Sequence, residues 1–267
     1  MKTAVQLPTI RPSLCRQFLQ SLADHPQDIV EEVHVIAQRG TRTLWEEVVD
    51  VPGLNVILDW KEQGGPVYPQ RWLYAAAHPD VDVWVIADDD MEAQPETDWE
   101  TMCHAVHSGK YGVVSSGWAR TANMKSRFYP PRTGDWVTQA FTNTGGGMAV
   151  PKRLVPHLVA PLNDGVGLAS WLYDDIQVGL TSYLLGEQPA RYRGSFALHH
   201  ICAGGGLNGK GGLYGELEHL QPDPRWITTS PCKPTYHNKN DIYMPNPSAL
   251  TKEAKARHLE MKGSSDA

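Results

Sequence analysis

The chain has 267 residues, of which 41% are hydrophobic and 20% are charged. This length and apolar content suit a globular α/β protein, and we expect one domain with an elaborated C-terminal third. The formal net charge of -6 gives no general attraction to nucleic acid or to anionic membranes, although a local basic patch is compatible with it. The total charge therefore does not support a polyanionic partner and does not exclude one.

The cysteines and the N-terminus give expectations about location. The four cysteines lie far apart with no Cys-x-x-Cys pair, which predicts neither a zinc knuckle nor a disulfide framework. No stretch approaches the roughly 18 apolar residues that a membrane span needs, and Pro8 interrupts the N-terminus early. We therefore expect a cytoplasmic protein without a membrane span. The cysteines are Cys15, Cys103, Cys202 and Cys232.

In the first half, short apolar runs alternate with amphipathic segments, which is typical of a β-α-β sheet with helices on its faces. In the segment after Pro12, Leu14, Phe18 and Leu22 share one helical face, and Pro26 ends it. The run VDVWVIA is apolar at nearly every position and predicts a strand buried on both faces. The expected strands are 3–7, 31–38, 54–60, 81–87 and 111–117, and the expected helices are 12–26, 69–79 and about 97–109.

The second half is less regular. NTGGGMAVP (143–151) predicts a glycine-rich turn into a short strand, and WLYDDIQVGLTSYLLGEQP (171–189) predicts a helix that ends at Gly186. From His199 onward the chain is rich in glycine, proline and aromatic residues with weak periodicity. We therefore expect a core over residues 1–200 and a loop-rich extension of the same domain over 201–267.

Three successive carboxylates, Asp88, Asp89 and Asp90, follow the predicted strand 81–87. Ligands bind beyond the carboxyl ends of the strands in open sheets of this kind. Adjacent carboxylates are unfavourable unless solvent or a cation relieves them, and Mg²⁺ and Mn²⁺ take oxygen ligands. Asp88 and Asp90 can face one site while Asp89 turns away. Taken alone, the run fits a solvated acidic turn equally well.

A second acidic pair, Asp174 and Asp175, opens the predicted helix that ends at Gly186. A helix N-cap with one extra charge that matches the helix dipole also explains this pair. What favours a functional site is the order of four features along one chain: DDD at a strand end, GGG before MAV, DD at a helix start, and HH at a strand end.

These motifs resemble those of GT-A-fold glycosyltransferases, and most closely those of the inverting family 2. LPTIRPSLCRQFLQSL resembles the family's opening strand, Pro-Thr loop and first helix, and QGGPVYPQRWLYAAA its glycine-rich segment and Ala-rich helix. IADDDMEAQPE is similar to its D-x-D strand end, and NTGGGMAVPKRLV to its small-residue turn. The resemblance covers about residues 3–200. It implies a Rossmann-like mixed sheet flanked by helices, with a nucleotide-sugar-binding and catalytic core.

The resemblance also implies roles for individual residues. Asp175, beside Asp174, would accept the proton of the acceptor hydroxyl, since its spacing to Gly186 and to His199 is similar to the family's. Asp88 and Asp90 would hold Mn²⁺ or Mg²⁺, with His199 or His200 completing the coordination or contacting the diphosphate. A structural role for either histidine is an equal alternative. The implied donor-binding residues are Thr9, Arg11, Arg71, Asp88, Asp89 and Gly146.

The sequence departs from the family at three places. Asp174 replaces the usual Glu, Trp72 stands where Asn normally follows the arginine, and AQRG at 37–40 replaces the acidic turn that usually contacts the nucleobase. A UDP-sugar is the expected donor, but these departures leave the nucleotide open. A surface salt bridge would explain Arg71 as well as a nucleotide contact does.

The acceptor is open between a saccharide and a hydroxymethylated DNA base, because small stand-alone relatives in bacteriophages are thought to glycosylate such bases. A phage-encoded member would act in the host cytoplasm. Three segments interleave basic and aromatic residues that suit phosphates and stacked rings: KSRFYPPR, ARYR and GGGLNGKGGLYG. The expected acceptor-binding residues are Lys125, Arg127, Tyr129 and Tyr214, with Phe128 or Tyr192 as further stacking candidates.

Two other classes share the predicted features. A GT-A-like nucleotidyltransferase would also place carboxylates and a metal at the strand end, but it usually has a glycine-rich loop after the first strand, which PTIRPSL lacks. A non-catalytic nucleotide-sugar-binding module would keep the fold without turnover. The presence of Asp88, Asp90 and Asp175 together argues against the module.

Overall fold

A computed structural model describes most of the N-terminal two thirds of the chain and short pieces beyond it. The described residues are 1–62, 67–115, 119–121, 126–127, 136–137, 140–142, 147–163, 178–179, 181–182, 185–192, 226–228 and 243–245.

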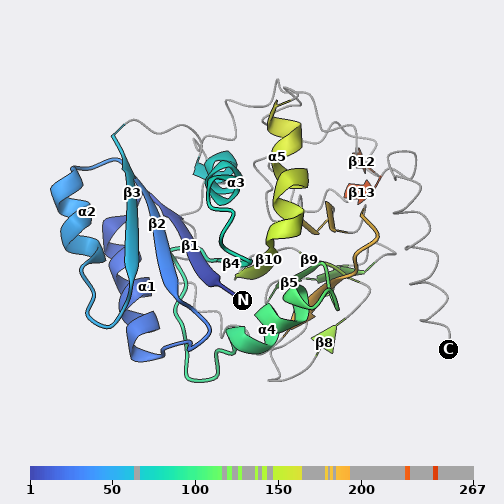
Figure 1. The fold of residues 1–267 in the computed structure, drawn as a ribbon, viewed down its shortest axis with the longest axis horizontal. Helices are drawn as coiled ribbons and strands as arrows, with labels where there is room; N and C mark the ends of the chain where they lie inside the picture. Colours follow the sequence, from blue (N-terminus) through green and yellow to red (C-terminus); the bar gives the residue numbers. More distant parts are fainter. Residues whose placement is uncertain are drawn as a thin grey trace.

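The fold is built on one mixed sheet of eight strands in the order β3-β2-β1-β4-β10-β5-β11-β8 (Figure 1). The first four strands are parallel, β10 is antiparallel to both its neighbours, β5 and β11 are parallel, and β8 is antiparallel to β11. The strands are β1 (Thr3–Thr9), β2 (Glu32–Gln38), β3 (Val56–Lys61), β4 (Val83–Ile86), β5 (Val113–Ser115), β8 (Trp136–Val137), β10 (Met148–Pro151) and β11 (Pro189–Tyr192).

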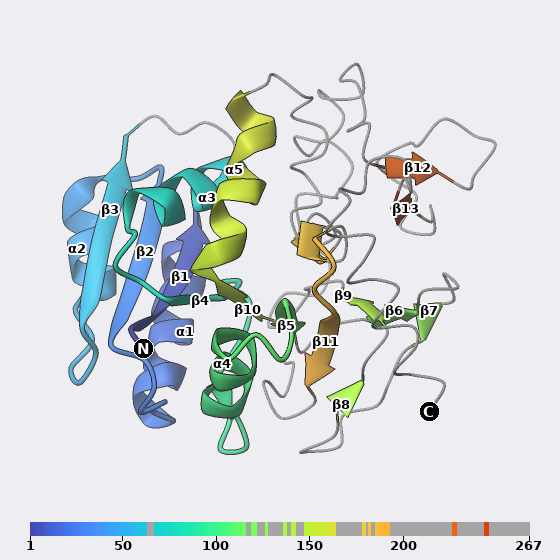
Figure 2. The ribbon, with the colours of Figure 1, turned by 45° about the vertical axis from the view of Figure 1, so that its right-hand side comes forward.

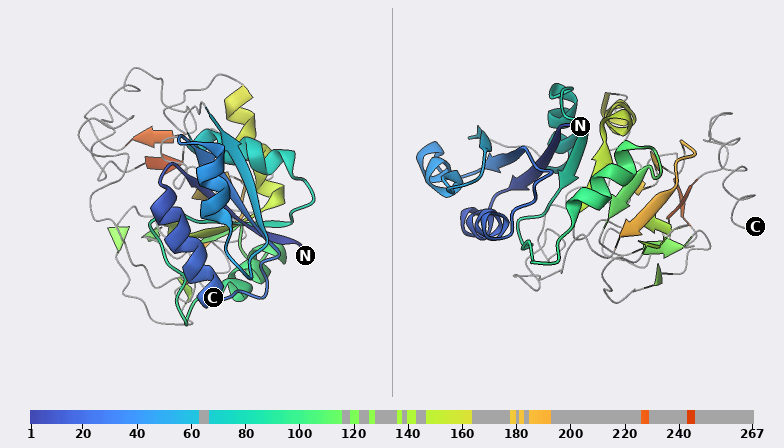
Figure 3. Two further views of the ribbon diagram at one scale, coloured as in Figure 1. Left: turned by 90° about the vertical axis from the view of Figure 1, so that its left-hand side faces the viewer. Right: turned by 60° about the horizontal axis from the view of Figure 1, so that its bottom comes forward.

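Helices cover both faces of the sheet, as the views in Figures 2 and 3 show. One apolar cluster joins α1 (Pro12–Asp24), α2 (Arg42–Val49) and α4 (Trp99–His107) to one face of the sheet. A second cluster joins α3 (Val67–Ala77) and α5 (Val155–Asn163) to the opposite face. A short 3₁₀ turn, η1 (Lys152–Leu154), precedes α5. This arrangement confirms the predicted mixed sheet flanked by helices.

Strand β4 shows why its sequence is apolar at successive positions. Val83 and Val85 belong to the cluster with α1, α2 and α4, whereas Trp84 and Ile86 belong to the cluster with α3 and α5. Successive side chains of a strand point to opposite faces, so a strand covered on both faces needs apolar residues throughout. The expectation that this strand is buried on both faces is confirmed.

Several elements were not predicted. Helix α2 buries only Trp45 and Val48, which gives too short an apolar pattern to recognise. Helix α5 contains Pro161 beyond its first turn, where a proline normally argues against a helix. Short strands also occur within the segments expected to be loops: β6 (Ala119–Thr121), β7 (Ser126–Arg127) and β9 (Ala140–Thr142) form one small sheet, and β12 (Trp226–Thr228) and β13 (Tyr243–Pro245) form another.

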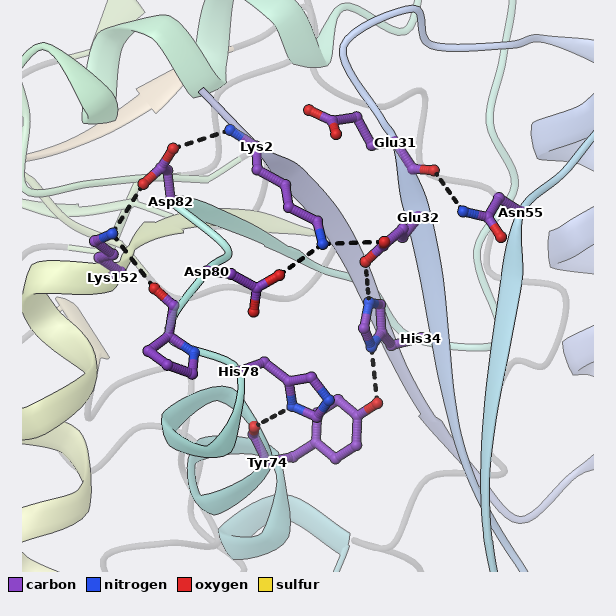
Figure 4. Close-up of polar contacts among 11 residues, drawn as sticks. Lys2, Glu31, Glu32, His34, Asn55, Tyr74, His78, Asp80, Asp82 and Lys152 are labelled. Atoms are coloured by element: carbon purple, nitrogen blue, oxygen red, sulfur yellow. Dashed lines mark hydrogen bonds and ion pairs between the residues drawn. The ribbon is translucent and has the colours of Figure 1, made fainter.

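Charged residues link the amino ends of the parallel strands (Figure 4). Lys2 Nζ lies 3.0 Å from Glu32 and 2.7 Å from Asp80, and Asp82 accepts hydrogen bonds from the Lys2 backbone N–H and, at 3.0 Å, from Lys152 Nζ. These contacts link the amino ends of β1, β2 and β4 to β10 and its following turn. They hold the register of the central strands at the end away from the predicted site.

No helix among the described residues is long and apolar enough to cross a membrane. Of the four cysteines, Cys15 and Cys103 lie in described segments, and both are buried free thiols. The proposed division into residues 1–200 and 201–267 stays a prediction, because most of the second part lies outside the described residues.

Candidate functional site

Two loops meet at the carboxyl edge of the parallel strands. Strand β1 pairs with β4 in parallel, with Gln6 opposite Ile86, and the Ala87 N–H donates to the Gln6 carbonyl. Strand β1 ends at Thr9, shortly before α1, and β4 ends at Ile86, two residues before Asp88. The parallel pairing therefore brings the loop after β1 against the acidic run, where ligands of such sheets are expected.

Asp89 is the buried member of the run, with a side chain only 6% exposed. The Thr9 hydroxyl donates to its Oδ2 at 2.5 Å, and Arg11 Nε donates to the same oxygen at 3.1 Å. A second guanidinium nitrogen of Arg11 donates to Asp89 Oδ1. The Arg11 backbone N–H in turn donates to Thr9 Oγ1 at 3.0 Å. Asp89 thus fastens the loop after β1 to the end of β4.

Asp88 and Asp90 are more open, with side chains 43% and 20% exposed. Arg71, whose side chain is 2% exposed, places a guanidinium nitrogen 3.6 Å from Asp88 Oδ1. Arg11 lies 3.8 Å from Asp90 Oδ2. Two guanidinium groups therefore offset part of the charge of three adjacent carboxylates, at separations where Coulomb attraction near a protein surface is substantial. The arginines therefore add to the metal or solvent expected from the sequence to relieve this charge.

The positions of Arg11 and Arg71 have recognisable local causes. Arg11 is the N-cap of α1, next to a proline in its first turn, so the start of the helix fixes it beside Thr9. Arg71 lies on α3, and its backbone carbonyl accepts a hydrogen bond from the Gln6 side chain at 2.9 Å. Trp72, which stands at the position of the family's Asn, is fully buried in the cluster with α5.

The chemistry of the exposed carboxylates fits a hard divalent cation. Mg²⁺ and similar ions are commonly bound by one or two carboxylates together with the phosphates of the substrate. Asp88 and Asp90 supply two such groups. In the described part of the chain no group of three or more His, Cys, Asp or Glu side chains is arranged to hold a metal. Two carboxylates of this kind suit a cation that also binds the phosphates of a substrate.

Many of the predicted site residues lie outside the described residues, so their positions stay predictions: Lys125, Tyr129, Gly146, Asp174, Asp175, His199, His200 and Tyr214. Arg127 lies in β7 of the small sheet, but its side chain is not described. Gly147, next to Gly146, has φ +100° directly before β10, a conformation that favours glycine. Gly186 has φ +76° after a helical segment at 178–179 and 181–182, which agrees with the predicted helix end.

Tyr192 is not a stacking residue, which corrects one of the acceptor predictions. It lies in β11, is 5% exposed, and donates its hydroxyl proton to Asp98 Oδ2 at 2.7 Å. Burial, together with the bond to Asp98, raises the pKa of Tyr192, so its hydroxyl stays a donor. The residue packs in the core because β11 belongs to the main sheet, and this strand was not among those predicted from the sequence.

The sequence matches no protein-family model and no curated protein. Among solved structures, residues 1–349 of TarS from S. aureus align with a TM-score of 0.51 and 16% identity, over 72% of this chain and 58% of that one. GalNAc-T7 with UDP, GalNAc and Mn²⁺ aligns with a TM-score of 0.53 and 12% identity, over 73% of this chain and 43% of that one. The chain thus spans about half the length of each.

These similarities define the class of fold. TarS and GalNAc-T7 are GT-A-type glycosyltransferases, and the described residues of this chain have the same Rossmann-like mixed sheet. The protein is therefore a GT-A-fold protein. At such low identity the likeness concerns the fold alone, so the activity has to be argued from the residues of the site.

Proposed function

We propose that the protein is a metal-dependent inverting glycosyltransferase that resembles family 2 and transfers a sugar from a nucleotide sugar to an acceptor hydroxyl. The observation that carries this proposal is the meeting of Thr9, Arg11 and Arg71 with three carboxylates at the carboxyl edge of a GT-A sheet. Carboxylates for a cation and guanidinium groups for phosphates are the two charge types that a metal-bound diphosphate requires.

The donor would lie across this edge. Asp88 and Asp90 would hold Mn²⁺ or Mg²⁺, which when bound neutralises the charge that develops on the leaving diphosphate. Arg71 and Arg11 would contact the phosphates, and Thr9 would line the nucleotide pocket. Gly146, in the glycine-rich turn that the sequence predicts before Met148, would allow the donor to approach the backbone closely. UDP is the proposed nucleotide, and GalNAc-T7, one of the proteins of similar fold, was solved with UDP and Mn²⁺.

The proposed base is Asp175, with Asp174 beside it. It would accept the proton of the acceptor hydroxyl as the new bond forms, so that the sugar is transferred in a single displacement with inversion. His199 or His200 would complete the metal site or contact the diphosphate. All four residues are assigned through the resemblance of their motifs.

The acceptor is proposed to be a saccharide or a hydroxymethylated DNA base, as in a phage-type enzyme. The proposed contacts are Lys125, Arg127, Tyr129 and Tyr214, because basic and aromatic side chains suit both a phosphate backbone and a sugar or base ring. The net charge of -6 favours the saccharide over the polyanion.

A donor screen read by mass spectrometry tests the proposal. Purified protein with Mn²⁺ is offered UDP-, GDP- and dTDP-sugars, with oligosaccharides and hydroxymethylated duplex DNA as separate acceptors. The expected product carries the added mass of one sugar, and Asp175→Asn should not form it. In a parallel reaction with a nucleoside triphosphate and a sugar phosphate, formation of a nucleotide sugar with release of pyrophosphate would instead identify a nucleotidyltransferase. Donor binding without any product would identify a binding module.

A further inference from the structure

The three aspartates of the acidic run have different surroundings, and Arg11 lies between two of them. Two nitrogens of its guanidinium donate hydrogen bonds to the Asp89 carboxylate. The nitrogen that bonds Asp89 Oδ1 also lies 3.8 Å from Asp90 Oδ2, which is within ion-pair range but too far for a hydrogen bond. The Arg11 guanidinium therefore lies near two carboxylates, and it donates hydrogen bonds to that of Asp89 and not to that of Asp90.

Arg11 bonds Asp89 and not Asp90 because the two aspartates differ in their hydrogen-bond partners and in their burial. Thr9 and Arg11 both donate to Asp89, whose side chain is 6% exposed, whereas the Asp90 side chain is 20% exposed. A guanidinium is a planar fork, and two parallel hydrogen bonds to one carboxylate fix its direction. Without the charge on Asp89, the nearby carboxylate of Asp90 would be the better partner, and a small rotation of Arg11 would bring the two into contact.

We infer that Asp89 is a positioning residue that holds Arg11 away from Asp90 and so leaves the Asp90 oxygens open to the divalent cation. This inference rests on the proposed function, because it takes Asp88 and Asp90 as the cation ligands. It gives Asp89 an indirect role in place of the direct donor contact predicted from the sequence. It also explains why the middle aspartate of the run is the buried one.

The test is Mn²⁺ binding by the full chain without nucleotide, measured from the electron paramagnetic resonance signal of free Mn²⁺. Asp89→Asn should weaken Mn²⁺ binding by about tenfold or more, because Arg11 then forms a charge-assisted bond with Asp90. The double variant Arg11→Met/Asp89→Asn should recover wild-type affinity within about threefold, because the competing cation is gone. Unchanged binding by Asp89→Asn, or no recovery in the double variant, overturns the inference.

A second variant keeps the inference testable if Asp89→Asn does not fold. Arg11→Met alone should bind Mn²⁺ at least as tightly as the wild type, and weaker binding would overturn the inference. Asp28→Asn, an exposed carboxylate in the loop after α1, is the matched control for the loss of one charge and should bind normally. Thermal unfolding of every variant separates misfolding from lost binding.

The Mn²⁺ measurements test the metal site and the role of Asp89 separately. A wild-type chain that binds no Mn²⁺ contradicts the metal site of the proposed function, and the role of Asp89 falls with it. A wild-type chain that binds Mn²⁺, with no recovery in the double variant, contradicts only the role of Asp89. In that case Asp89 would be a direct ligand or a purely structural residue, because neither role is restored by removing Arg11.

Discussion

The guanidinium of Arg71 lies 3.6 Å from the Asp88 carboxylate, with the arginine side chain 2% exposed and the aspartate side chain 43% exposed. A buried cation thus faces a carboxylate that opens toward solvent at the carboxyl edge of the sheet. Because charges of opposite sign attract one another more strongly away from water, the buried Arg71 offsets part of the negative charge of Asp88. The pair links α3 to the end of β4.

Replacement of Arg71 should weaken donor binding more than it lowers stability. Arg71→Lys keeps the charge but loses the planar fork, and the loss of one charged hydrogen bond corresponds to about a 10- to 100-fold weaker Kd for UDP. Isothermal titration calorimetry with UDP in the presence of Mn²⁺ measures this Kd. Arg16→Lys is the control, since Arg16 binds backbone carbonyls at the end of α2, among them that of Asp50 at 2.6 Å. Equal affinities of the two variants would contradict the donor role of Arg71.

Removal of the metal should abolish transfer. Chelation with EDTA leaves the charge of the leaving diphosphate without its cation, and Mn²⁺ or Mg²⁺ added in excess should restore activity. Asp90→Asn should require more Mn²⁺ to reach half-maximal rate, because one of the two described carboxylates is gone. Full activity of the chelated wild-type enzyme, measured with the best donor of the screen, would show that the acidic run does not hold a catalytic metal.

Asp175→Asn should lower turnover by roughly 10²- to 10⁴-fold with little change in UDP binding, because it removes the group that accepts the proton of the acceptor. Asp174→Asn serves as the matched control, since it removes a charge at the adjacent position. Steady-state kinetics and UDP titration of both variants separate turnover from binding. If Asp174→Asn is the inactive variant and Asp175→Asn is nearly normal, the base is Asp174.

The sequence was most informative where one physical requirement decides the residue type. Strand β4 is covered on both faces, so its apolar run could be read directly, and Pro26 marked the end of α1 to within two residues. The place of the acidic run also followed from the sequence, because it directly follows that strand. Helix α2 was missed because it lies at the edge of the fold and buries only Trp45 and Val48.

The partners of the acidic run were not predictable in the same way. Arg11 and Asp89 are far apart in the sequence, and their contact depends on β1 and β4 being neighbours in the sheet. A local pattern carries no information on strand order, so the arginines could be suspected as donor ligands but not as partners of particular carboxylates. Tyr192 was misassigned for the same reason, because its burial follows from the pairing of β11 with β5.

Acidification should destabilise the protein through His34, which is 1% exposed. Its Nε2 lies 2.9 Å from Glu32 and its Nδ1 2.7 Å from the Tyr74 hydroxyl, beside His78 (Figure 4). Burial raises the pKa of Tyr74 to about 12, so Tyr74 donates to a neutral imidazole. Burial also lowers the pKa of His34 below its usual 6.5, and the bond to Glu32 offsets this only in part.

The direction of the pH effect follows from that lowered pKa. Well above pH 6.5, the usual pKa of histidine, both folded and unfolded chains hold His34 neutral, and the full stability is present. As the pH falls below this value the unfolded chain takes up a proton that the folded chain resists, so the free energy of unfolding decreases. Urea denaturation between pH 7.5 and pH 5 should show a smaller decrease for His34→Gln than for the wild type. His104→Gln, on the exposed side of α4, should behave like the wild type, and an unchanged slope for His34→Gln would contradict the assignment.

The acceptor can be decided by the salt dependence of DNA binding. If a hydroxymethylated base is the acceptor, the protein should bind duplex DNA at low salt, and the affinity should fall steeply as salt is raised, because each phosphate contact releases counterions. Lys125→Ala and Arg127→Ala should each weaken binding and reduce the salt slope by about one. Arg42→Ala, whose exposed side chain pairs with Glu46 on α2, is the control and should leave the slope unchanged. Fluorescence anisotropy with labelled duplexes, with and without hydroxymethylated bases, gives these values. If no binding to either duplex is measured at low salt, the saccharide is the acceptor that the charge of the chain already favours.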